Sequence, residues 1–292
     1  MAKLGVITDG ISREFEHALT VMNEFDLEHA ELQFVWDKEV GDHSDAQIAK
    51  ITSLIKAHNV QVPCISRHIF GGLSVNDMTL DHPTYLAHLD SLRRCITMAK
   101  AVGSPLVRIM AFRKEMILFG SHGADQWNVS NGAWDNLVKL VAPAVQIAED
   151  EAMTIVVETG NNAMITSAWL GRKLIDTLGS SRLKLMWDPC NSLYCNERTY
   201  PDGYEAIKGD NLNDTLGHIH MKDSLINIPH ATVQCRALGE GDIAPYLDDL
   251  AEALREDAYD GVISLESVYR PDGGTFEDGF RASANKFKQW FG

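Results

Sequence analysis

Four polar residues in the second half of the chain stand at the ends of apolar runs. Glu158, Asp188 and Glu266 each follow directly on such a run, and His220 lies within a fourth. A carboxylate in such a place must be paired or bound to a metal, because burying an unpaired charge is costly. Three carboxylates and one imidazole form a hard, mainly oxygen site that suits Mn2+, Mg2+, Co2+ or Zn2+. The sequence therefore predicts one divalent metal ion held by these four residues.

The spacing of the four residues indicates that they come from neighbouring structural units. Asp188 lies 30 residues after Glu158, and His220 lies 32 residues after Asp188. Each interval is about the length of one strand and one helix. Glu266 follows His220 by 46 residues, an interval that also contains the additional segment 224–241.

The elements expected to position these residues alternate regularly. Short strand-like runs are separated by amphipathic segments, with Ser12 expected to cap the first helix and Ser44 with Gln47 to form a capping box before the second. The strands are expected at residues 4–8, 30–35, 60–65, 106–110, 154–157, 183–187, 218–221 and 261–265. The helices are expected at residues 12–25, 44–55, 83–103, 134–148, 167–178, 243–254 and 276–290, with a short one at 201–207.

This alternation predicts the fold class. A strand that is followed by a helix and then by another strand pairs in parallel through a crossover. Eight such units in 292 residues favour an α/β protein with a single (β/α)8 barrel, one catalytic domain spanning residues 1–292. In such a barrel the carboxyl ends of the strands converge on one rim, where catalytic residues gather.

The composition excludes several function classes. The net charge of −15 argues against binding to nucleic acid or to an anionic membrane, both of which need clustered lysine and arginine. The five cysteines are irregularly spaced and include no CxxC pair, so they suggest neither a disulfide framework nor a zinc knuckle. The first residues lack the features of a signal peptide. We expect a reduced, cytoplasmic protein.

The strand ends resemble those of the xylose isomerase-like TIM-barrel superfamily, which includes sugar isomerases and epimerases, inosose dehydratase and endonuclease IV. The likeness covers essentially the whole chain. It rests on Val157-Glu158-Thr159 with Asn161-Asn162, Trp187-Asp188-Pro189-Cys190-Asn191, His218-Ile-His220-Met-Lys222-Asp223, Leu238-Gly-Glu-Gly-Asp242 and Leu265-Glu266.

The resemblance to the ketose 3-epimerase branch implies roles for these residues. It implies a metal held by Glu158, Asp188, His220 and Glu266, with the two glutamates as the proton-transferring pair. Several ketose epimerases carry a histidine where this chain has Asn191. The substrate of those enzymes therefore cannot be carried over to this chain.

The chemistry expected at such a site is proton abstraction beside a sugar carbonyl. The metal would stabilise the developing enediolate by binding the carbonyl and a neighbouring hydroxyl. One of Glu158 and Glu266 would remove the proton and the other would return one. Return to the same carbon gives epimerisation, and return to the adjacent carbon gives aldose–ketose isomerisation. We expect a metal-dependent isomerase or epimerase of a small sugar.

Further residues are predicted to serve the same site. His218 and Lys222 share strand parity with His220 and are expected to face the substrate. Asp223 is expected to orient His220. The remaining predicted substrate contacts are Asn191, Arg236 and His68, with Arg108 and Arg113 as weaker candidates. Three carboxylates and a dication leave one negative charge, which slightly favours a neutral sugar over a phosphorylated one.

Alternative functions stay open on the same scaffold. A metal-dependent dehydratase or lyase of a keto-cyclitol or keto-sugar shares the first step, and cleavage of an oxidised glycoside is a related possibility. A catalytically silent sugar-binding barrel is a third. A nuclease is disfavoured by the negative charge and by too few histidines for a three-metal cluster. The family likeness also leads us to expect a homo-oligomer, a dimer or a tetramer.

Overall fold

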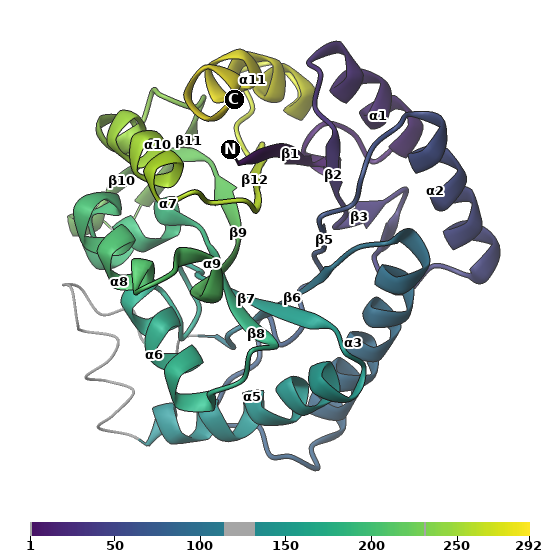
Figure 1. The fold of residues 1–292 in the computed structure, drawn as a ribbon, viewed down its shortest axis with the longest axis vertical. Helices are drawn as coiled ribbons and strands as arrows, with labels where there is room; N and C mark the ends of the chain where they lie inside the picture. Colours follow the sequence, from purple (N-terminus) through teal and green to yellow (C-terminus); the bar gives the residue numbers. More distant parts are fainter. Residues whose placement is uncertain (1, 114–131, 231) are drawn as a thin grey trace.

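The computed structural model describes residues 2–113, 132–230 and 232–292. Eight parallel strands form a nearly closed barrel with helices around it (Figure 1). The strands of the barrel are β1 (Lys3–Ile7), β2 (His29–Glu31), β5 (Cys64–Ile65), β6 (Leu106–Met110), β7 (Thr154–Glu158), β8 (Leu183–Trp187), β9 (Leu216–Met221) and β12 (Val262–Leu265). This arrangement confirms the predicted single (β/α)8 barrel.

The order of the strands around the barrel is β2-β1-β12-β9-β8-β7-β6-β5. Isolated parallel bridges between His29 and Gln61 and between Leu32 and Ile65 join the two ends of this sheet. Strands β2 and β5 are short, and the chain between β2 and helix α2 (Asp45–Ala57) forms a separate ribbon of β3 (Phe34–Val35) and β4 (Lys38–Glu39). The predicted strand at 30–35 therefore corresponds to two short strands.

The helices lie outside the barrel strands and alternate with them along the chain (Figure 1). The described helices are α1 (Phe15–Glu24), α2 (Asp45–Ala57), α3 (Pro83–Val102), α5 (Ala133–Asp150), α6 (Ala168–Leu178), α7 (Pro189–Ser192), α8 (Tyr204–Lys208), α9 (Leu212–Thr215), α10 (Leu247–Glu256) and α11 (Phe276–Phe291). None of them is long and apolar enough to span a bilayer.

Local sequence signals account for several helix ends. Ser44 and Gln47 form the predicted capping box of α2, and Gly103 ends α3 in the left-handed conformation that glycine adopts without strain. The predicted cap at Ser12 is wrong, because α1 begins at Phe15 behind Glu14. The Ser12 hydroxyl instead accepts a hydrogen bond from the backbone N–H of Glu14 in the preceding turn.

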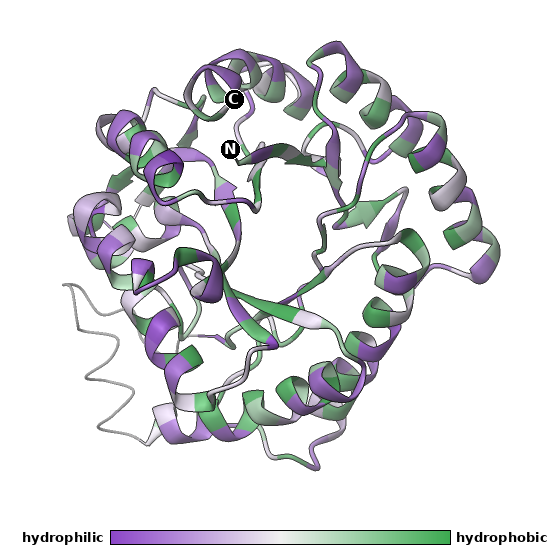
Figure 2. Ribbon diagram, in the orientation of Figure 1, coloured by the Kyte–Doolittle hydropathy of each residue, from purple (hydrophilic) through white to green (hydrophobic). Residues whose placement is uncertain are grey.

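Hydropathy follows this layered arrangement. The barrel strands are largely apolar, whereas the outward faces of the surrounding helices are polar (Figure 2). Val107, Ile109, Ile155 and Val157 are completely buried, so the strands pack against both the barrel interior and the helices. Ionisable side chains buried inside this barrel therefore carry a desolvation cost that specific partners must offset.

The additional segment at 224–241 contains an antiparallel hairpin. Its strands are β10 (Asp223–Asn227) and β11 (Thr232–Arg236), paired from Asp223 opposite Arg236 to Asn227 opposite Thr232. The hairpin follows directly on β9, the strand that carries His220.

Candidate metal centre and active site

The four predicted metal ligands converge at the carboxyl ends of four neighbouring strands. Glu158 is the last residue of β7, and Asp188 directly follows β8. His220 is the second-to-last residue of β9, and Glu266 directly follows β12. These strands are adjacent in the order β12-β9-β8-β7, so the two glutamates lie at the outer ends of the arc. One ligand atom from each residue lies within 4.8 Å of all the others. Such an arrangement can hold a metal ion.

The turn after β8 fixes the orientation of Asp188. Asp188 caps the short helix α7, and its Oδ1 accepts a hydrogen bond of 3.1 Å from the backbone N–H of Asn191. The Asn191 amide nitrogen donates to Asp188 Oδ2 at 2.8 Å and to the Thr159 carbonyl oxygen at 2.9 Å. The structure thus places Asn191, a predicted substrate contact, where its amide holds Asp188.

Two cationic side chains pair with the ligand carboxylates. Arg108 on β6 donates from Nη1 to Glu158 Oε2 at 2.9 Å and from Nη2 to the Ser66 carbonyl oxygen at 2.5 Å. Lys222 Nζ lies 2.6 Å from Asp188 Oδ2 and 2.7 Å from Glu266 Oε2. Lys222 therefore lies in the cluster itself, and its predicted contact with a substrate stays a prediction.

The charges of the buried groups explain their shifted pKa values. Burial alone would raise the pKa of Glu158, but the charge of Arg108 and the contact with His220 hold that pKa at about 2. Burial, together with repulsion from Glu266 and Glu158, raises the pKa of Asp188 to about 7 despite the Lys222 ammonium. Burial would lower the pKa of His220, but the charges of Glu31 and Glu158 raise it well above its usual value. The cluster thus carries an excess of negative charge.

The size of this excess fits a divalent cation. Glu158, Asp188 and Glu266, with the buried Glu31 behind them, contribute four carboxylates. Arg108 and Lys222 contribute two fixed positive charges. When His220 is neutral, as a metal ligand must be, two negative charges are left over, and one divalent ion would neutralise them. The donor set and its charge therefore fit one metal ion of charge +2.

The ring nitrogen of His220 that points away from the ligand cluster contacts Glu31. His220 Nδ1 lies 3.2 Å from Glu158 Oε1, on the side of the cluster, and Nε2 lies 2.8 Å from Glu31 Oε1. Glu31 Oε2 lies 2.8 Å from His218 Nε2, which also lies 3.0 Å from Ser264 Oγ. Both histidines and Glu31 have no exposed surface.

Two sequence-based expectations are corrected by these contacts. His218 was expected to contact the substrate, but it is completely buried against Glu31 and Ser264. Asp223 was expected to orient His220, but its carboxylate accepts backbone N–H groups of Ser224, Gly239, Gly241 and Ile243. Asp223 begins β10, beyond the end of β9, the strand that carries His220. It holds the base of the β10–β11 hairpin.

The other two predicted substrate contacts lie outside the ligand cluster. His68 is 45% exposed and its Nδ1 lies 2.8 Å from Glu39 Oε1. Arg236 on β11 donates to Gln234 Oε1 at 2.6 Å and to the Cys235 carbonyl oxygen at 3.4 Å. These contacts join neither residue to the four ligands, so their roles toward a substrate stay predictions.

Glu31 is the buried residue that the sequence analysis missed. It was treated as an interior residue of the run 30–35, whereas the structure ends β2 at Glu31. The signal that identified Glu158, an acid directly after an apolar run, is absent at Glu31, which only Ala30 separates from the polar pair Glu28-His29. Its partners His218 and His220 lie on β9, which β1 and β12 separate from β2, so the contact crosses the barrel interior.

A cavity of about 540 Å³ opens beside the ligand cluster. It shares Glu266 with the cluster and is otherwise lined mainly by the loop after β1 and by the ends of β2 and β12. Asp9, Ser12, Arg13 and Gln33 supply polar groups, and Phe34 supplies an apolar wall. Glu266, with 21% of its side chain exposed, faces solvent more than Glu158 does.

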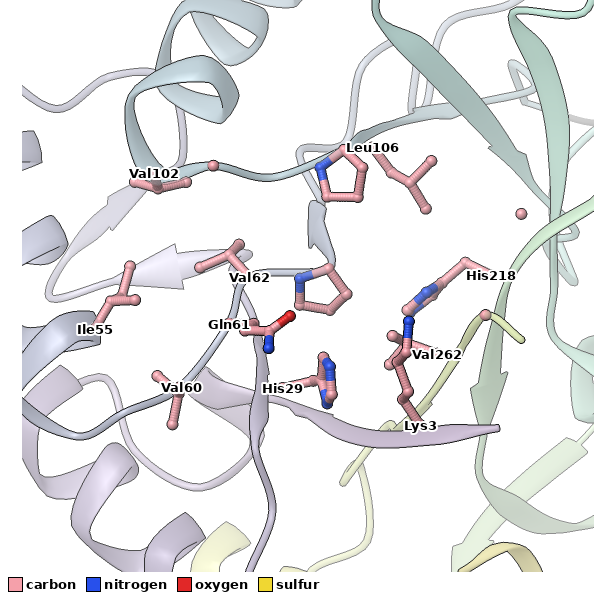
Figure 3. A pocket seen from close by; sticks show the side chains of 15 residues that line it. Lys3, His29, Ile55, Val60, Gln61, Val62, Val102, Leu106, His218 and Val262 are labelled. Carbon is pink, nitrogen blue, oxygen red and sulfur yellow. The ribbon is translucent and has the colours of Figure 1, made fainter. Parts of the chain in front are cut away.

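A second cavity, of about 470 Å³, lies at the opposite end of the barrel (Figure 3). Lys3, His29, Leu106 and Val262, from the first residues of four strands, lie around it. Because chemistry in (β/α)8 barrels takes place at the carboxyl ends of the strands, the cavity beside Glu266 is the one suited to a substrate.

Comparisons with known proteins agree with this architecture. No curated protein is similar enough in sequence to match the chain. Among solved structures, a zinc-bound IOLI protein superposes with a TM-score of 0.73 at 13% identity, covering 99% of this chain and 98% of that one. The probable 3-DHS dehydratase AsbF from Bacillus anthracis gives 0.72 at 15%, covering 99% of both chains. D-psicose 3-epimerase from Clostridium cellulolyticum H10 gives 0.68 at 15%, also covering 99% of both.

At these identities the superpositions show a shared fold. The family assignment rests on the sequence, which matches the family model described as xylose isomerase-like TIM barrel over residues 19–290. This chain belongs to the xylose isomerase-like TIM barrel family.

Proposed function

We propose that the protein is a divalent-metal-dependent isomerase or epimerase of a small sugar. The observation that carries this proposal is the convergence of Glu158, Asp188, His220 and Glu266, with ligand atoms all within 4.8 Å, next to a cavity that shares Glu266. The two glutamates lie on the outermost strands of the ligand arc, β7 and β12. This separation suits a pair that exchanges protons with a substrate from two sides.

The ion would be Mn2+, Mg2+, Co2+ or Zn2+, all of which accept this mixed carboxylate and imidazole donor set. When bound, it would act as a Lewis acid toward a substrate carbonyl and the neighbouring hydroxyl, which makes the adjacent C–H more acidic. Glu158, Asp188 and Glu266 would supply oxygen ligands, and His220 would supply Nδ1.

The surroundings of the two glutamates suggest different tasks. Glu158 is fixed by Arg108 and almost completely buried, which keeps it ionised and limits its movement. Glu266 borders the cavity, and its only side-chain hydrogen bond among the described residues comes from Lys222. We assign removal of the substrate proton to Glu158, which is ionised and can accept it, and delivery of a different proton from the other side to Glu266, which can take one up from solvent through the cavity. Lys222 would hold a substrate oxygen when it moves off Asp188.

The charge of the site does not select between neutral and phosphorylated sugars. The three ligand carboxylates and a divalent ion alone would have a net charge of −1. When Arg108, Lys222 and Glu31 are included, the net charge of the site with the ion is zero. Arg13 lines the same cavity as Glu266 and could pair with an anionic group. A substrate panel should therefore include sugars of both kinds.

The experiment that tests the proposal is isotope exchange. Metal-loaded protein is incubated in deuterated water with a panel of aldoses, ketoses, keto-cyclitols and their phosphates, and products are followed by NMR and mass spectrometry. We expect deuterium at a single carbon of one sugar, with conversion to an isomer of unchanged elemental composition. Loss of water would identify a dehydratase instead. Binding with no exchange on any compound would identify a sugar-binding protein and contradict the proposal.

Variants locate the proton transfer. Glu266→Gln and Glu158→Gln should each keep the fold and reduce exchange by at least about 100-fold, the usual contribution of a general base. Glu252→Gln, at an exposed position of α10, changes a carboxylate in the same way outside the ligand cluster and serves as the control. A homo-oligomeric state stays a prediction that size-exclusion chromatography would test. A cytoplasmic location stays a prediction that cell fractionation would test.

A further inference from the structure

A buried network behind His220 is not accounted for by metal binding or by substrate contact. Glu31 makes three side-chain contacts inside the barrel. Its Oε1 receives hydrogen bonds from His220 Nε2, at 2.8 Å, and from Ser66 Oγ, and its Oε2 receives one from His218 Nε2, at 2.8 Å. Glu31, Ser66 and both histidines are completely buried.

These contacts fix which nitrogen of His220 carries the proton. An ionised carboxylate only accepts hydrogen bonds, so the nitrogens that face Glu31 must be N–H donors. With its proton on Nε2, a neutral His220 has its lone pair on Nδ1, and Nδ1 is the nitrogen that faces Glu158 in the ligand cluster. Glu31 therefore selects the form of His220 that can bind a metal and holds its ring at that angle.

His218 supports Glu31 from the other side. Its Nδ1 is buried and has no hydrogen-bond partner among the described residues, so a proton there would be left without an acceptor. The proton of His218 therefore belongs on Nε2, between Glu31 and Ser264. Both oxygens of Glu31 are thus occupied by fixed donors, which leaves the carboxylate one orientation.

Glu31, His218 and His220 could also be considered as a second metal site, because their ligand atoms lie close together. The geometry favours a hydrogen-bonded network. The contacts from Glu31 to both histidines are 2.8 Å, the usual length of charge-assisted N–H···O bonds. None of the three residues has exposed surface, and Ser66 already donates to the oxygen that faces His220.

We propose that Glu31 is a positioning residue, which acts through His220 to preorganise the metal site. The proposal rests on the proposed metal-dependent function, because it assumes that His220 Nδ1 is a ligand. In Glu31→Gln, one of the two oxygens is replaced by an NH2 group that cannot accept from a histidine. Either one N–H loses its acceptor, or His220 shifts its proton to Nδ1 and can no longer bind the ion.

The test compares metal affinity in matched variants. Glu31→Gln is compared with wild type and with Glu197→Gln, in which a buried glutamate that accepts backbone N–H groups of Ala168 and Trp169 is changed in the same way. Titration with Co2+ gives both the affinity and the visible spectrum, which reports the ligand geometry. We expect Glu31→Gln to bind about 10- to 100-fold more weakly with an altered spectrum, and Glu197→Gln to bind as wild type does.

Ser66→Ala provides a milder variant if Glu31→Gln does not fold. It removes one of the three donors to Glu31 and leaves the carboxylate in place, so a smaller loss of affinity is expected, about two- to tenfold. Equal affinity and spectra in wild type, Glu31→Gln and Ser66→Ala would overturn this inference while the metal-dependent function stands. Two ions per wild-type chain and one in Glu31→Gln would also overturn it, because Glu31 would then be a ligand. No ion bound to wild type would overturn both proposals.

Discussion

Arg108 on β6 and Glu158 on β7 form an ion pair inside the barrel, with 2.9 Å between Nη1 and Oε2 and both side chains almost completely buried. Met110 is paired with Glu158 in the sheet, so Arg108, two residues earlier, faces the same interior. Arg108 also donates to the carbonyl oxygen of Ser66, the residue whose hydroxyl contacts Glu31. One guanidinium therefore supports a carboxylate of the proposed metal site and the strand end behind it.

Arg108→Met should destabilise the protein by about 3–5 kcal/mol, because it leaves the Glu158 charge buried without its partner. Arg93→Met is the control, since the Arg93–Asp90 pair is exposed and should change stability by less than about 0.5 kcal/mol. Chemical denaturation of both variants measures the two effects. A loss below about 1 kcal/mol for Arg108→Met would show that Glu158 does not depend on this ion pair.

Lys222→Met should strengthen the binding of a divalent ion, by about tenfold or more. The Lys222 ammonium lies between Asp188 and Glu266, and an ammonium and a metal ion compete for the same carboxylate oxygens. Calorimetric titration with Mn2+ measures the change, with Lys184→Met as the control because Lys184 donates to the Asn213 carbonyl oxygen on another part of the barrel. Weaker binding in Lys222→Met would mean that the lysine assists the ion.

Glu39 should make stability depend on pH in the acid range. Burial opposes ionisation, but hydrogen bonds from the ring and backbone N–H of His68 and the charge of Arg67 lower the pKa of Glu39 to about 2. Because the folded pKa lies below the unfolded value, this stabilisation is complete above about pH 4.5 and is lost as the pH falls toward 2. The shift corresponds to at most about 3 kcal/mol.

The prediction is checked by the difference in unfolding free energy between wild type and Glu39→Gln. That difference should be largest at neutral pH and should shrink between pH 4.5 and 3. A difference that does not change with pH would show that the contacts of Glu39 do not depend on its charge.

Gly279→Ala should destabilise the protein even though alanine favours helices by about 1 kcal/mol over glycine. A Cβ at Gly279 in α11 would overlap the Tyr269 carbonyl oxygen, a backbone atom in the loop after Glu266 that cannot move aside alone. We expect a net loss of about 2–4 kcal/mol. Asn285→Ala, exposed on the same helix, should be neutral or slightly stabilising in the same thermal unfolding measurement. Equal behaviour of the two variants would contradict the steric explanation.

The parts of the fold that the sequence predicts well depend on local patterns. Strands β6 and β8 were predicted with their observed bounds, and the capping box at Ser44 and Gln47 was predicted from four residues. The positions of Glu158, Asp188 and Glu266 at strand ends could also be predicted, because an acid after an apolar run marks the rim of the barrel. Their convergence follows from the order of the strands.

The parts that could not be predicted depend on contacts across the barrel. Glu31 and His220 are far apart in the sequence, and no local pattern indicates that they share a hydrogen bond. Asp223 lies three residues after His220 and was expected to orient it, but it binds four backbone N–H groups of the hairpin region. Strand parity identified the interior side for His218, but it could not say that Glu31 fills the space beside it.

The most direct test of the metal centre is anomalous X-ray diffraction from crystals grown with Mn2+. We expect one anomalous peak per chain, bonded to His220 Nδ1 and to oxygens of Glu158, Asp188 and Glu266 at about 2.0–2.3 Å. An anomalous peak at another position would contradict the assignment of this cluster as the metal site. So would crystals saturated with Mn2+ that show no ion at these four side chains.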